Sequence, residues 1–111
     1  MRQLHIAVDF DGTVVVEQWP EIGPLKFGAR WVLQWASRRG HKLVLWTCRE
    51  GQLLLDAALF LGSQQLYFDT LNDNLPERIA MYGVNSRKVG ADLMIDDRAG
   101  IVFWPMVFLR I

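Results

Sequence analysis

Two carboxylates stand two residues apart where the first apolar segment of the chain ends. The stretch VDFDGT at 8–13 overlaps the end of the run LHIAV at 4–8. Such a segment is either a strand followed by an ordinary polar turn, or a rigid platform that delivers two acids to a reaction. One carboxylate can attack phosphorus to form an acyl phosphate, and the other can protonate the leaving oxygen and later deprotonate water. Asp9 and Asp11 are therefore candidates for nucleophilic and acid–base chemistry.

Other side chains capable of chemistry gather beside two further apolar runs, which we predict to be strands. They are Thr47, Cys48 and Arg49 after 42–46, Lys88 before 92–95, and Asp96, Asp97 and Arg98 after 92–95. Ligands of open parallel sheets bind beyond the carboxyl ends of the strands, which is where most of these residues belong. Four clustered carboxylates repel one another, and hard oxygen ligands favour Mg²⁺ over zinc. Thr47 and Lys88 can bind phosphoryl oxygens, which are charged throughout phosphoryl transfer.

The motifs and their order resemble those of the haloacid dehalogenase-like (HAD) phosphatases. The matching segments are DFDGT after the first strand, the threonine that ends LVLWT, a lysine before the fourth strand, and IDD after it. The resemblance covers essentially the whole chain. VDFDGT, PEIG, LWTCREG and SRK…ADLMIDDR look more narrowly like a group of small hydrolase-like members without a cap domain. The chain is also distantly similar to deoxyribonucleotidases and polynucleotide 3′-phosphatases.

The resemblance implies a role for each matching position. It makes Asp9 the nucleophile and a Mg²⁺ ligand, and Asp11 the acid/base, whose backbone carbonyl also binds the metal. Asp96 and Asp97 complete the metal site. Thr47 and Lys88, together with Gly12, bind the transferred phosphoryl group. The implied activity is Mg²⁺-dependent hydrolysis of phosphomonoesters through an aspartyl phosphate.

Apolar runs and helical periodicity indicate how the chain positions these residues. Mostly continuous apolar runs predict buried strands at 4–8, 42–46, 66–68, 92–95 and 101–103, with a further segment at 106–109. A helix is predicted from Pro24 and Leu25 to a stop at Gly40, a second at 51–62, and a short third after Asn74. The predicted fold is α/β: a three-layer, Rossmann-like domain with a mainly parallel five- to six-stranded sheet and helices on both faces. The resemblance adds a flap hairpin at 12–23 and no cap domain.

Composition limits the class of protein. The 111 residues suffice for one domain over 1–111 with a proper core, and 12 basic residues balance 12 acidic ones. No net charge therefore favours nucleic acid or a membrane surface. Cys48 is the only cysteine, which excludes an internal disulfide and indicates a reducing compartment. No signal-peptide pattern precedes Asp9, and the longest apolar stretch, at 101–109, is too short to span a bilayer. We expect a soluble, cytoplasmic domain.

Several side chains near the predicted site have two interpretations. Arg49 and Arg98 are either substrate contacts or members of surface ion pairs. Cys48 is either a thiol beside the substrate or, as we expect from the frequent burial of cysteine, a buried and inert one. Trp19 in the flap either stacks on a base or sugar of the substrate or stabilises the hairpin.

The expected partner is a phosphorylated small molecule or a nucleotide, and the end of a nucleic acid is a further option. A second copy of the chain is a further candidate partner, as a lid over the site. A receiver domain is excluded, because its lysine follows its last strand, whereas here Lys88 precedes the pair Asp96 and Asp97. The remaining alternative is a catalytically inactive binding module on the same fold.

Overall fold

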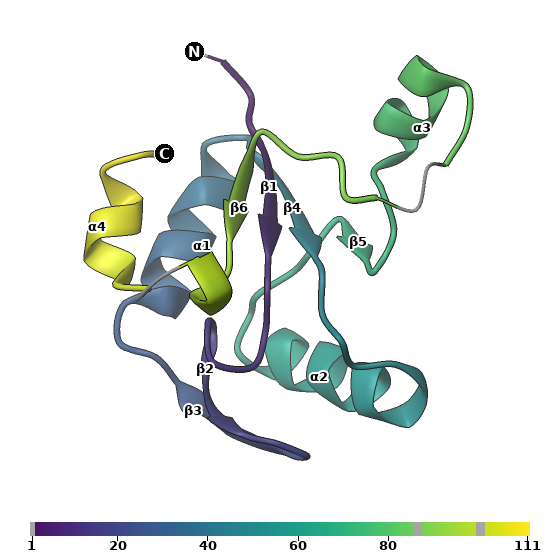
Figure 1. Cartoon of the computed structure of the whole chain (residues 1–111). Helices are drawn as coiled ribbons and strands as arrows, with labels where there is room; N and C mark the ends of the chain where they lie inside the picture. Colours follow the sequence, from purple (N-terminus) through teal and green to yellow (C-terminus); the bar gives the residue numbers. More distant parts are fainter. Residues whose placement is uncertain (1, 86–87, 100–101) are drawn as a thin grey trace.

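Four parallel strands form the central sheet of the computed structural model, which describes residues 2–85, 88–99 and 102–111. They are β1 (His5–Val8), β4 (Lys42–Leu45), β5 (Thr70–Leu71) and β6 (Leu93–Ile95), in the spatial order β5-β4-β1-β6 (Figure 1). Ile6 of β1 pairs with Leu43 on one side and with Leu93 on the other. Strand order therefore reverses at β1, and the carboxyl end of β1 is the point at which ligands bind in such sheets.

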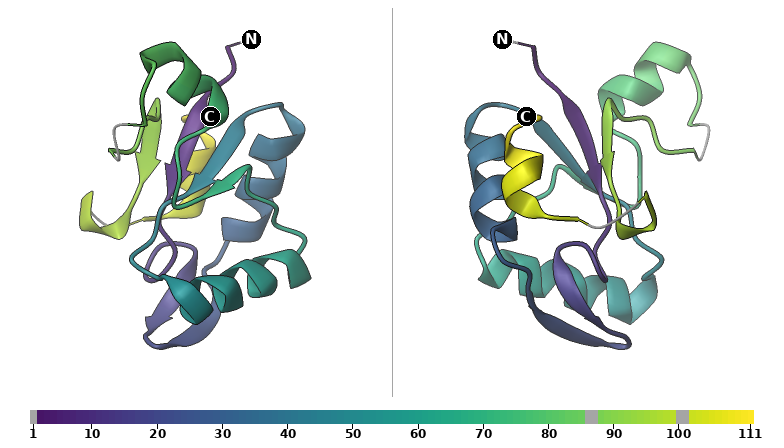
Figure 2. Two further views of the ribbon diagram at one scale, coloured as in Figure 1. Left: turned by 90° about the vertical axis from the view of Figure 1, so that its right-hand side faces the viewer. Right: turned by 60° about the vertical axis from the view of Figure 1, so that its left-hand side comes forward.

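Helices pack on both faces of the sheet, and one face holds most of the core. The helices are α1 (Ala29–Arg38), α2 (Gly51–Ser63), α3 (Pro76–Tyr82) and α4 (Trp104–Phe108), with a 3-10 turn, η1, at Asp97–Ala99. Ile6 and Val8, which alternate along β1, pack with buried residues of α1, α2 and α4. On the opposite face Ala7 and Val44 pack with Leu75, just before α3. Figure 2 shows α1 and α4 side by side on the same face of the sheet.

The α/β class and the parallel sheet are confirmed, and they are consistent with a Rossmann-like architecture. The predicted five or six strands are not confirmed, because the described residues form four strands in this sheet. Residues 66–68 form a connection, and β5 begins only at Thr70. The predicted strand at 101–103 is partly outside the described residues, and the described part, 102–103, is not a strand.

The apolar run at 106–109 is largely helical and not a strand. Pro105 suits the first turn of α4, because the missing N–H of proline is not needed there. The apolar side chains of α4 pack on α1, where the ring of Phe108 lies 4.7 Å from that of Trp31 and 4.6 Å from that of Trp35. Helix packing therefore explains the hydrophobicity of this segment.

A two-stranded hairpin connects β1 to α1, as the resemblance predicted for 12–23. It consists of β2 (Val15–Gln18) and β3 (Glu21–Leu25), and Trp19 lies in its turn. Pro24 and Leu25 belong to β3, so the prediction that they start the helix was wrong. Gly28, with φ of 83°, separates β3 from α1, which begins at Ala29. Between β1 and α1, where every residue is described, the hairpin is the only regular element.

Further along, the described residues 46–85 and 88–92 form α2, β5 and α3. Within the described part of the chain, no helix has both the length and the apolar character needed to cross a bilayer.

Candidate active site

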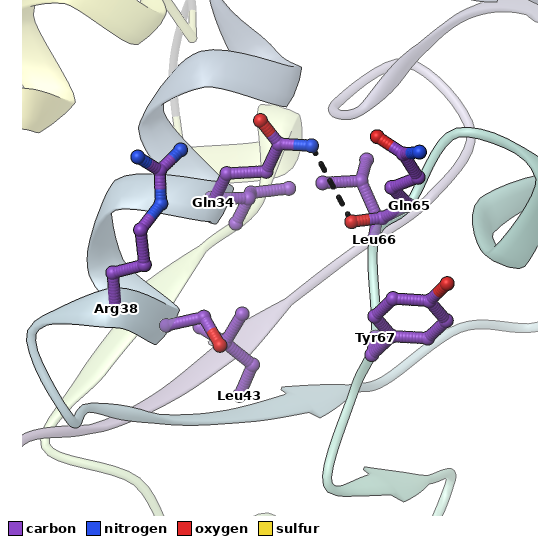
Figure 3. A pocket seen from close by; sticks show the side chains of 8 residues that line it. Gln34, Arg38, Leu43, Gln65, Leu66 and Tyr67 are labelled. Carbon is purple, nitrogen blue, oxygen red and sulfur yellow. Dashed lines mark hydrogen bonds between the residues drawn. The ribbon is translucent and has the colours of Figure 1, made fainter.

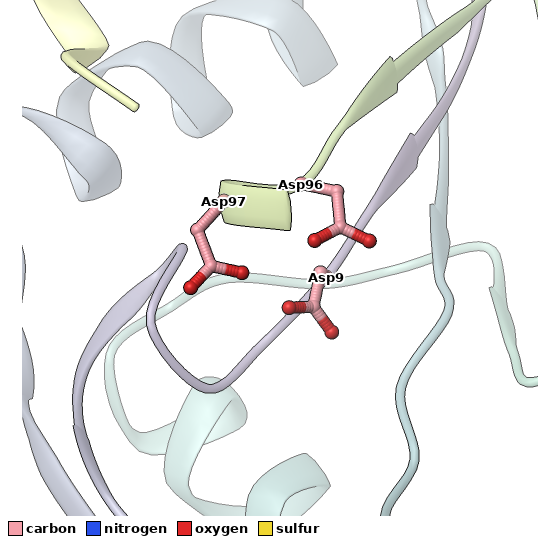
Figure 4. Close-up of side chains that lie close together, drawn as sticks. All are labelled: Asp9, Asp96 and Asp97. Carbon is pink, nitrogen blue, oxygen red and sulfur yellow. The ribbon is translucent and has the colours of Figure 1, made fainter. Parts of the chain in front are cut away.

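Three aspartates from two neighbouring strands converge beyond the carboxyl end of β1. Asp9 follows β1, and Asp96 and Asp97 follow β6, which pairs with β1. One carboxylate oxygen of each residue lies within 4.8 Å of an oxygen of the other two. Figure 4 shows the three carboxyl groups pointing toward a common space. The backbone holds the first of them in place, since the N–H of Asp9 donates to the carbonyl of Ile95 at 2.9 Å.

This crowding changes the acidity of Asp9. Partial burial, reinforced by the negative charges of Asp96 and Asp97, raises the pKa of Asp9 from 3.8 to about 6. Hydrogen bonds from the backbone of Phe10 and from Thr13 oppose part of this increase in pKa. The charges of Asp96 and Asp97 account for a smaller part of this increase than burial does, and a cation at the cluster would relieve that part.

Thr13 joins the two parts of the acidic cluster, and sequence reasoning missed this role. Its hydroxyl donates to Oδ2 of Asp9 at 3.4 Å and accepts the backbone N–H of Asp97 at 3.0 Å. The side chain is fully buried, and the indole of Trp104 donates to the Thr13 carbonyl at 2.9 Å. The signal was present, because Thr13 is the last residue of the DFDGT motif.

Gly12 has a conformational role in this structure. It has φ of 82°, and a Cβ at this position would overlap Oδ2 of Asp97. Its N–H donates to the carbonyl of Val15 at 2.9 Å, and its carbonyl accepts from Lys26 Nζ. The Gly12 amide has a backbone partner in this structure, and glycine is required so that the loop can approach Asp97; phosphate binding by Gly12 stays a prediction.

A hollow of about 330 Å³ lies beside the cluster. It is bounded by the two acids of the DFDGT motif, by the hairpin and by the loops after β4 and β6. Its lining residues are Asp9, Asp11, Glu17, Trp19, Thr47, Cys48, Asp97 and Arg98. Sequence reasoning had singled out all of these except Glu17, which lies on β2 in a segment with no motif of its own.

Arg49 forms an ion pair, but a buried one and not the predicted surface pair. It is 1% exposed and is not one of the described residues that line the hollow. Its guanidinium donates to both carboxylate oxygens of Asp11 at 2.8 Å, from Nε to Oδ2 and from Nη2 to Oδ1. Arg49 is therefore the buried ion-pair partner of Asp11 and not a member of a surface ion pair, and a direct contact with substrate stays a prediction.

The loop that presents Thr47 is fixed by a residue that the sequence did not reveal. Asn72, just after β5, accepts the backbone N–H of Thr47 at 2.7 Å and donates to the carbonyl of Arg49 at 2.9 Å. The hydroxyl of Thr47 accepts the N–H of Arg49 at 3.2 Å. Asn72 has φ of 51°, a conformation that asparagine tolerates better than most residues. Asn72 follows β5 but bonds to the loop after β4, so no local sequence pattern could predict this role.

The remaining predicted residues divide into two groups. Cys48 is exposed, so the expectation that it is buried was wrong, and Arg98 Nη2 lies 3.8 Å from its sulfur. Both residues line the hollow. Lys88 is also exposed, but it is not among the described lining residues, so the predicted phosphate-binding lysine does not reach the hollow in this structure.

A second hollow of about 310 Å³ lies elsewhere, beside α1 and the start of β4 (Figure 3). Gln34 donates across it to the carbonyl of Gln65 at 3.4 Å. Among its described lining residues Arg38 is the only charged one, and the others are apolar or neutral. It therefore lacks the grouped acids that make the first hollow chemically capable.

The acidic cluster fits a divalent cation in the chemistry of its donors. Asp9, Asp96 and Asp97 offer only hard carboxylate oxygens, which Mg²⁺ prefers, and their spacing allows a shared ion. The Asp11 carboxylate is not part of this group, because it faces Arg49. Its predicted contribution to the metal was through the backbone carbonyl.

Comparisons with known proteins give one informative match. No family model matches the chain, and no curated protein does. Among solved structures, a conserved protein from Bacteroides thetaiotaomicron is 38% identical, with a TM-score of 0.87. The match covers 96% of this chain and 88% of the other.

Proposed function

The chain belongs to the same family as the conserved protein from Bacteroides thetaiotaomicron, a relationship that identifies a fold and no activity, so we propose a function from the site itself. We propose that the protein hydrolyses phosphomonoesters with Mg²⁺, through an aspartyl phosphate on Asp9. The main support is the convergence of Asp9, Asp96 and Asp97 at the strand-order reversal, with Asp11 and Thr47 on the wall of the same hollow.

The residues divide the reaction between them. A carboxylate oxygen of Asp9 attacks phosphorus, and the bond from phosphorus to the ester oxygen breaks. Asp11 gives a proton to the departing oxygen and then accepts one from the water that attacks the aspartyl phosphate, which releases phosphate and restores Asp9. Bound Mg²⁺ would neutralise the acidic cluster and allow a phosphate dianion to approach Asp9.

Phosphate binding is assigned to residues that line the hollow. Thr47 and Arg98 line it from the loops after β4 and β6. We rank both ahead of Lys88, which the resemblance implied but which does not line the hollow. Thr47 offers a hydroxyl donor and Arg98 a permanent positive charge. Both kinds of group stabilise the equatorial oxygens of a transferring phosphoryl group.

The test is turnover and covalent labelling in one experiment. The wild-type protein, Asp9→Asn and the control Asp56→Asn are assayed with p-nitrophenyl phosphate and Mg²⁺, and acid-quenched samples are analysed by peptide mass spectrometry. Asp56 is exposed on α2 and is not among the lining residues of the hollow. We expect a phosphorylated peptide containing Asp9, abolished turnover in Asp9→Asn, and near wild-type turnover in Asp56→Asn.

Two results would contradict the proposal. One is an Asp9→Asn variant that turns over at the wild-type rate, since a neutral amide is not a nucleophile for phosphorus. The other is a wild-type protein that releases no phosphate from p-nitrophenyl phosphate, nucleotides or 3′-phosphorylated oligonucleotides with Mg²⁺. The second result would favour an inactive binding module on this fold.

A further inference from the structure

Arg49 is a charged side chain removed almost completely from water. Its side chain is 0% exposed in its pairing with Asp11, whose side chain is 16% exposed. Burying a guanidinium costs free energy unless its N–H groups have partners. Asp11 and the hairpin supply most of those partners, although Nη1 has none among the described residues. Arg49 directly follows Cys48, which lines the hollow, so a role for this buried charge in the site is a reasonable hypothesis.

The contacts of Arg49 fix it in one orientation. Besides the two hydrogen bonds to Asp11, Nη2 donates to the carbonyl of Glu21 at 3.1 Å. The guanidinium carbon lies 5.3 Å from the ring centre of Phe10 and 5.1 Å from that of Trp19. A planar guanidinium with a two-point contact to a carboxylate and aromatic rings close to it has little freedom to rotate.

The backbone of Asp11 is held by a bridge to Val15, and its carboxylate is oriented by Arg49. Asp11 lies in the loop after β1, and it lines the hollow. Its carboxylate accepts two side-chain hydrogen bonds from Arg49, one at each oxygen. A proton-transfer group must be placed within a fraction of an ångström of its productive position, and a displacement of about 1 Å can lower a rate about 10²-fold.

From these contacts we infer that Arg49 is a positioning residue that orients the ionised Asp11 as the base that accepts a proton from the attacking water, and that the hairpin holds Arg49 through Trp19 and Glu21. The inference rests on the proposed function, because it concerns the acid–base step of that reaction. It couples the hairpin to the chemistry: Trp19 contacts Arg49, and Arg49 contacts Asp11. Arg49 touches neither the substrate nor the metal in this scheme.

The test compares single and double variants of the Mg²⁺-loaded protein. Wild type, Arg49→Gln, Arg49→Lys, Asp11→Asn and the double variant are assayed with p-nitrophenyl phosphate for kcat and KM. Inhibition by inorganic phosphate is measured alongside. Arg30→Gln, on the exposed side of α1 and away from the hollow, is the matched control. We expect no change for this control.

We expect Arg49→Gln to lower kcat about 10²-fold, comparable with the loss of Asp11, and to leave KM and inhibition by phosphate nearly unchanged. In the Asp11→Asn background, adding Arg49→Gln should change kcat by less than about twofold, because the two residues act as one unit. Arg49→Lys keeps the charge without the two-point geometry, so it should restore only part of kcat.

Should Arg49→Gln fail to fold, Trp19→Leu tests the same coupling, because it removes the half-exposed ring that lies against the Arg49 guanidinium. It is assayed with acetyl phosphate, which has no ring to stack on Trp19. We expect kcat to fall about fivefold in the wild-type background. The effect should disappear in the Asp11→Asn background.

Three results would overturn the inference. The first is additive losses when Asp11→Asn is combined with Arg49→Gln or with Trp19→Leu. The second is a higher KM and weaker inhibition by phosphate in Arg49→Gln with kcat unchanged, which would make Arg49 a substrate ligand. The third is an inactive wild-type protein, which alone among the three would also overturn the proposed function.

Discussion

The backbone N–H of Asp97 donates to the hydroxyl of Thr13 at 3.0 Å, across 84 positions of the sequence. The same hydroxyl donates to the Asp9 carboxylate at 3.4 Å. One buried oxygen therefore connects the loop after β1 to the loop after β6, and it sets the separation of two proposed metal ligands.

We predict that Thr13→Val weakens Mg²⁺ binding while Thr13→Ser does not. Valine has nearly the shape of threonine but leaves the Asp97 N–H without its partner, which costs about 1–3 kcal/mol in the free energy of unfolding. Serine keeps the hydroxyl and loses one methyl group, at about 1 kcal/mol. Denaturant unfolding and Mg²⁺ titration by calorimetry measure both quantities. Equal Mg²⁺ affinities in the two variants would show that the hydroxyl does not organise the site.

The elements around this hydroxyl show what could be predicted from the sequence. Continuous apolar runs identified β1, β4 and β6, because a strand that is buried on both faces has apolar residues at successive positions. The residues after those strands then identified Asp9, Thr47, Asp96 and Asp97, since the sheet topology brings these ends together. The start of α1 was misjudged because the apolar spacing continues from β3 through Leu25, and only the short turn 26–28, which ends at the left-handed Gly28, separates the two elements.

The contacts between distant segments were beyond sequence reasoning. Arg49 is buried because the hairpin contacts the loop after β4. The residues around TCRE do not indicate whether this arginine is buried or exposed. Asn72 is similar, because its two hydrogen bonds reach a loop 23 and 25 positions away. Residues 104–108 form a helix that packs on Trp31 and Trp35. A short apolar run alone does not distinguish such a helix from a strand.

A second prediction concerns the backbone at Gly12. We expect Gly12→Ala to destabilise the protein more than Gly40→Ala, although the two glycines have similar φ angles of 82° and 88°. Both substitutions strain a left-handed residue by about 1–2 kcal/mol. Only at Gly12 does the new methyl group overlap the Asp97 carboxylate, whereas nothing lies within 4 Å at Gly40. Gly12→Ala should therefore also lower Mg²⁺ affinity, which Gly40→Ala should leave unchanged. Equal destabilisation and unchanged affinity in both would contradict the close approach.

A third prediction follows from the pKa of Asp9, which is raised from 3.8 to about 6 in the folded, metal-free protein. As the pH falls through 6, the folded state takes up a proton that the unfolded chain binds only near 3.8. The contribution of Asp9 to the free energy of unfolding therefore increases as the pH decreases between these two values. The charged form is the costly one, so removing the charge should stabilise the metal-free protein.

Asp9→Asn should accordingly be more stable than wild type by about 1 kcal/mol near pH 8, with EDTA present, and the gain should fall to about half by pH 5 and largely vanish only near the unfolded pKa of 3.8. Urea unfolding across this range, with Asp56→Asn as control, measures the difference. Excess Mg²⁺ should reverse the order at the higher pH, because it binds the folded wild type through the carboxylate that the variant lacks. A variant that is less stable than wild type at every pH without metal would show that the cluster is not strained by its charges.

The last prediction concerns access to the hollow. Every residue between β1 and α1 is described, and the only regular element there is the hairpin whose turn holds the half-exposed Trp19. A folded cap needs some 40 residues or more to hold a core, and neither this segment nor the described residues between β4 and β6 provide one. Water exclusion, which strengthens electrostatic interactions with the transferring group, must then come from the substrate or from a second copy of the chain.

We therefore expect small phosphate esters to be hydrolysed slowly and with weak selectivity, and bulkier substrates, such as nucleotides or 3′-phosphorylated oligonucleotides, to reach a higher kcat/KM. Light scattering during size-exclusion chromatography gives the oligomeric state, and a panel of these substrates with Mg²⁺ gives the selectivity. A dimer whose kcat/KM falls on dilution would assign the lid to the second copy. A monomer with high kcat/KM for one small metabolite alone would contradict the prediction, because a hairpin with one exposed indole offers too little surface to enclose and discriminate so small a ligand.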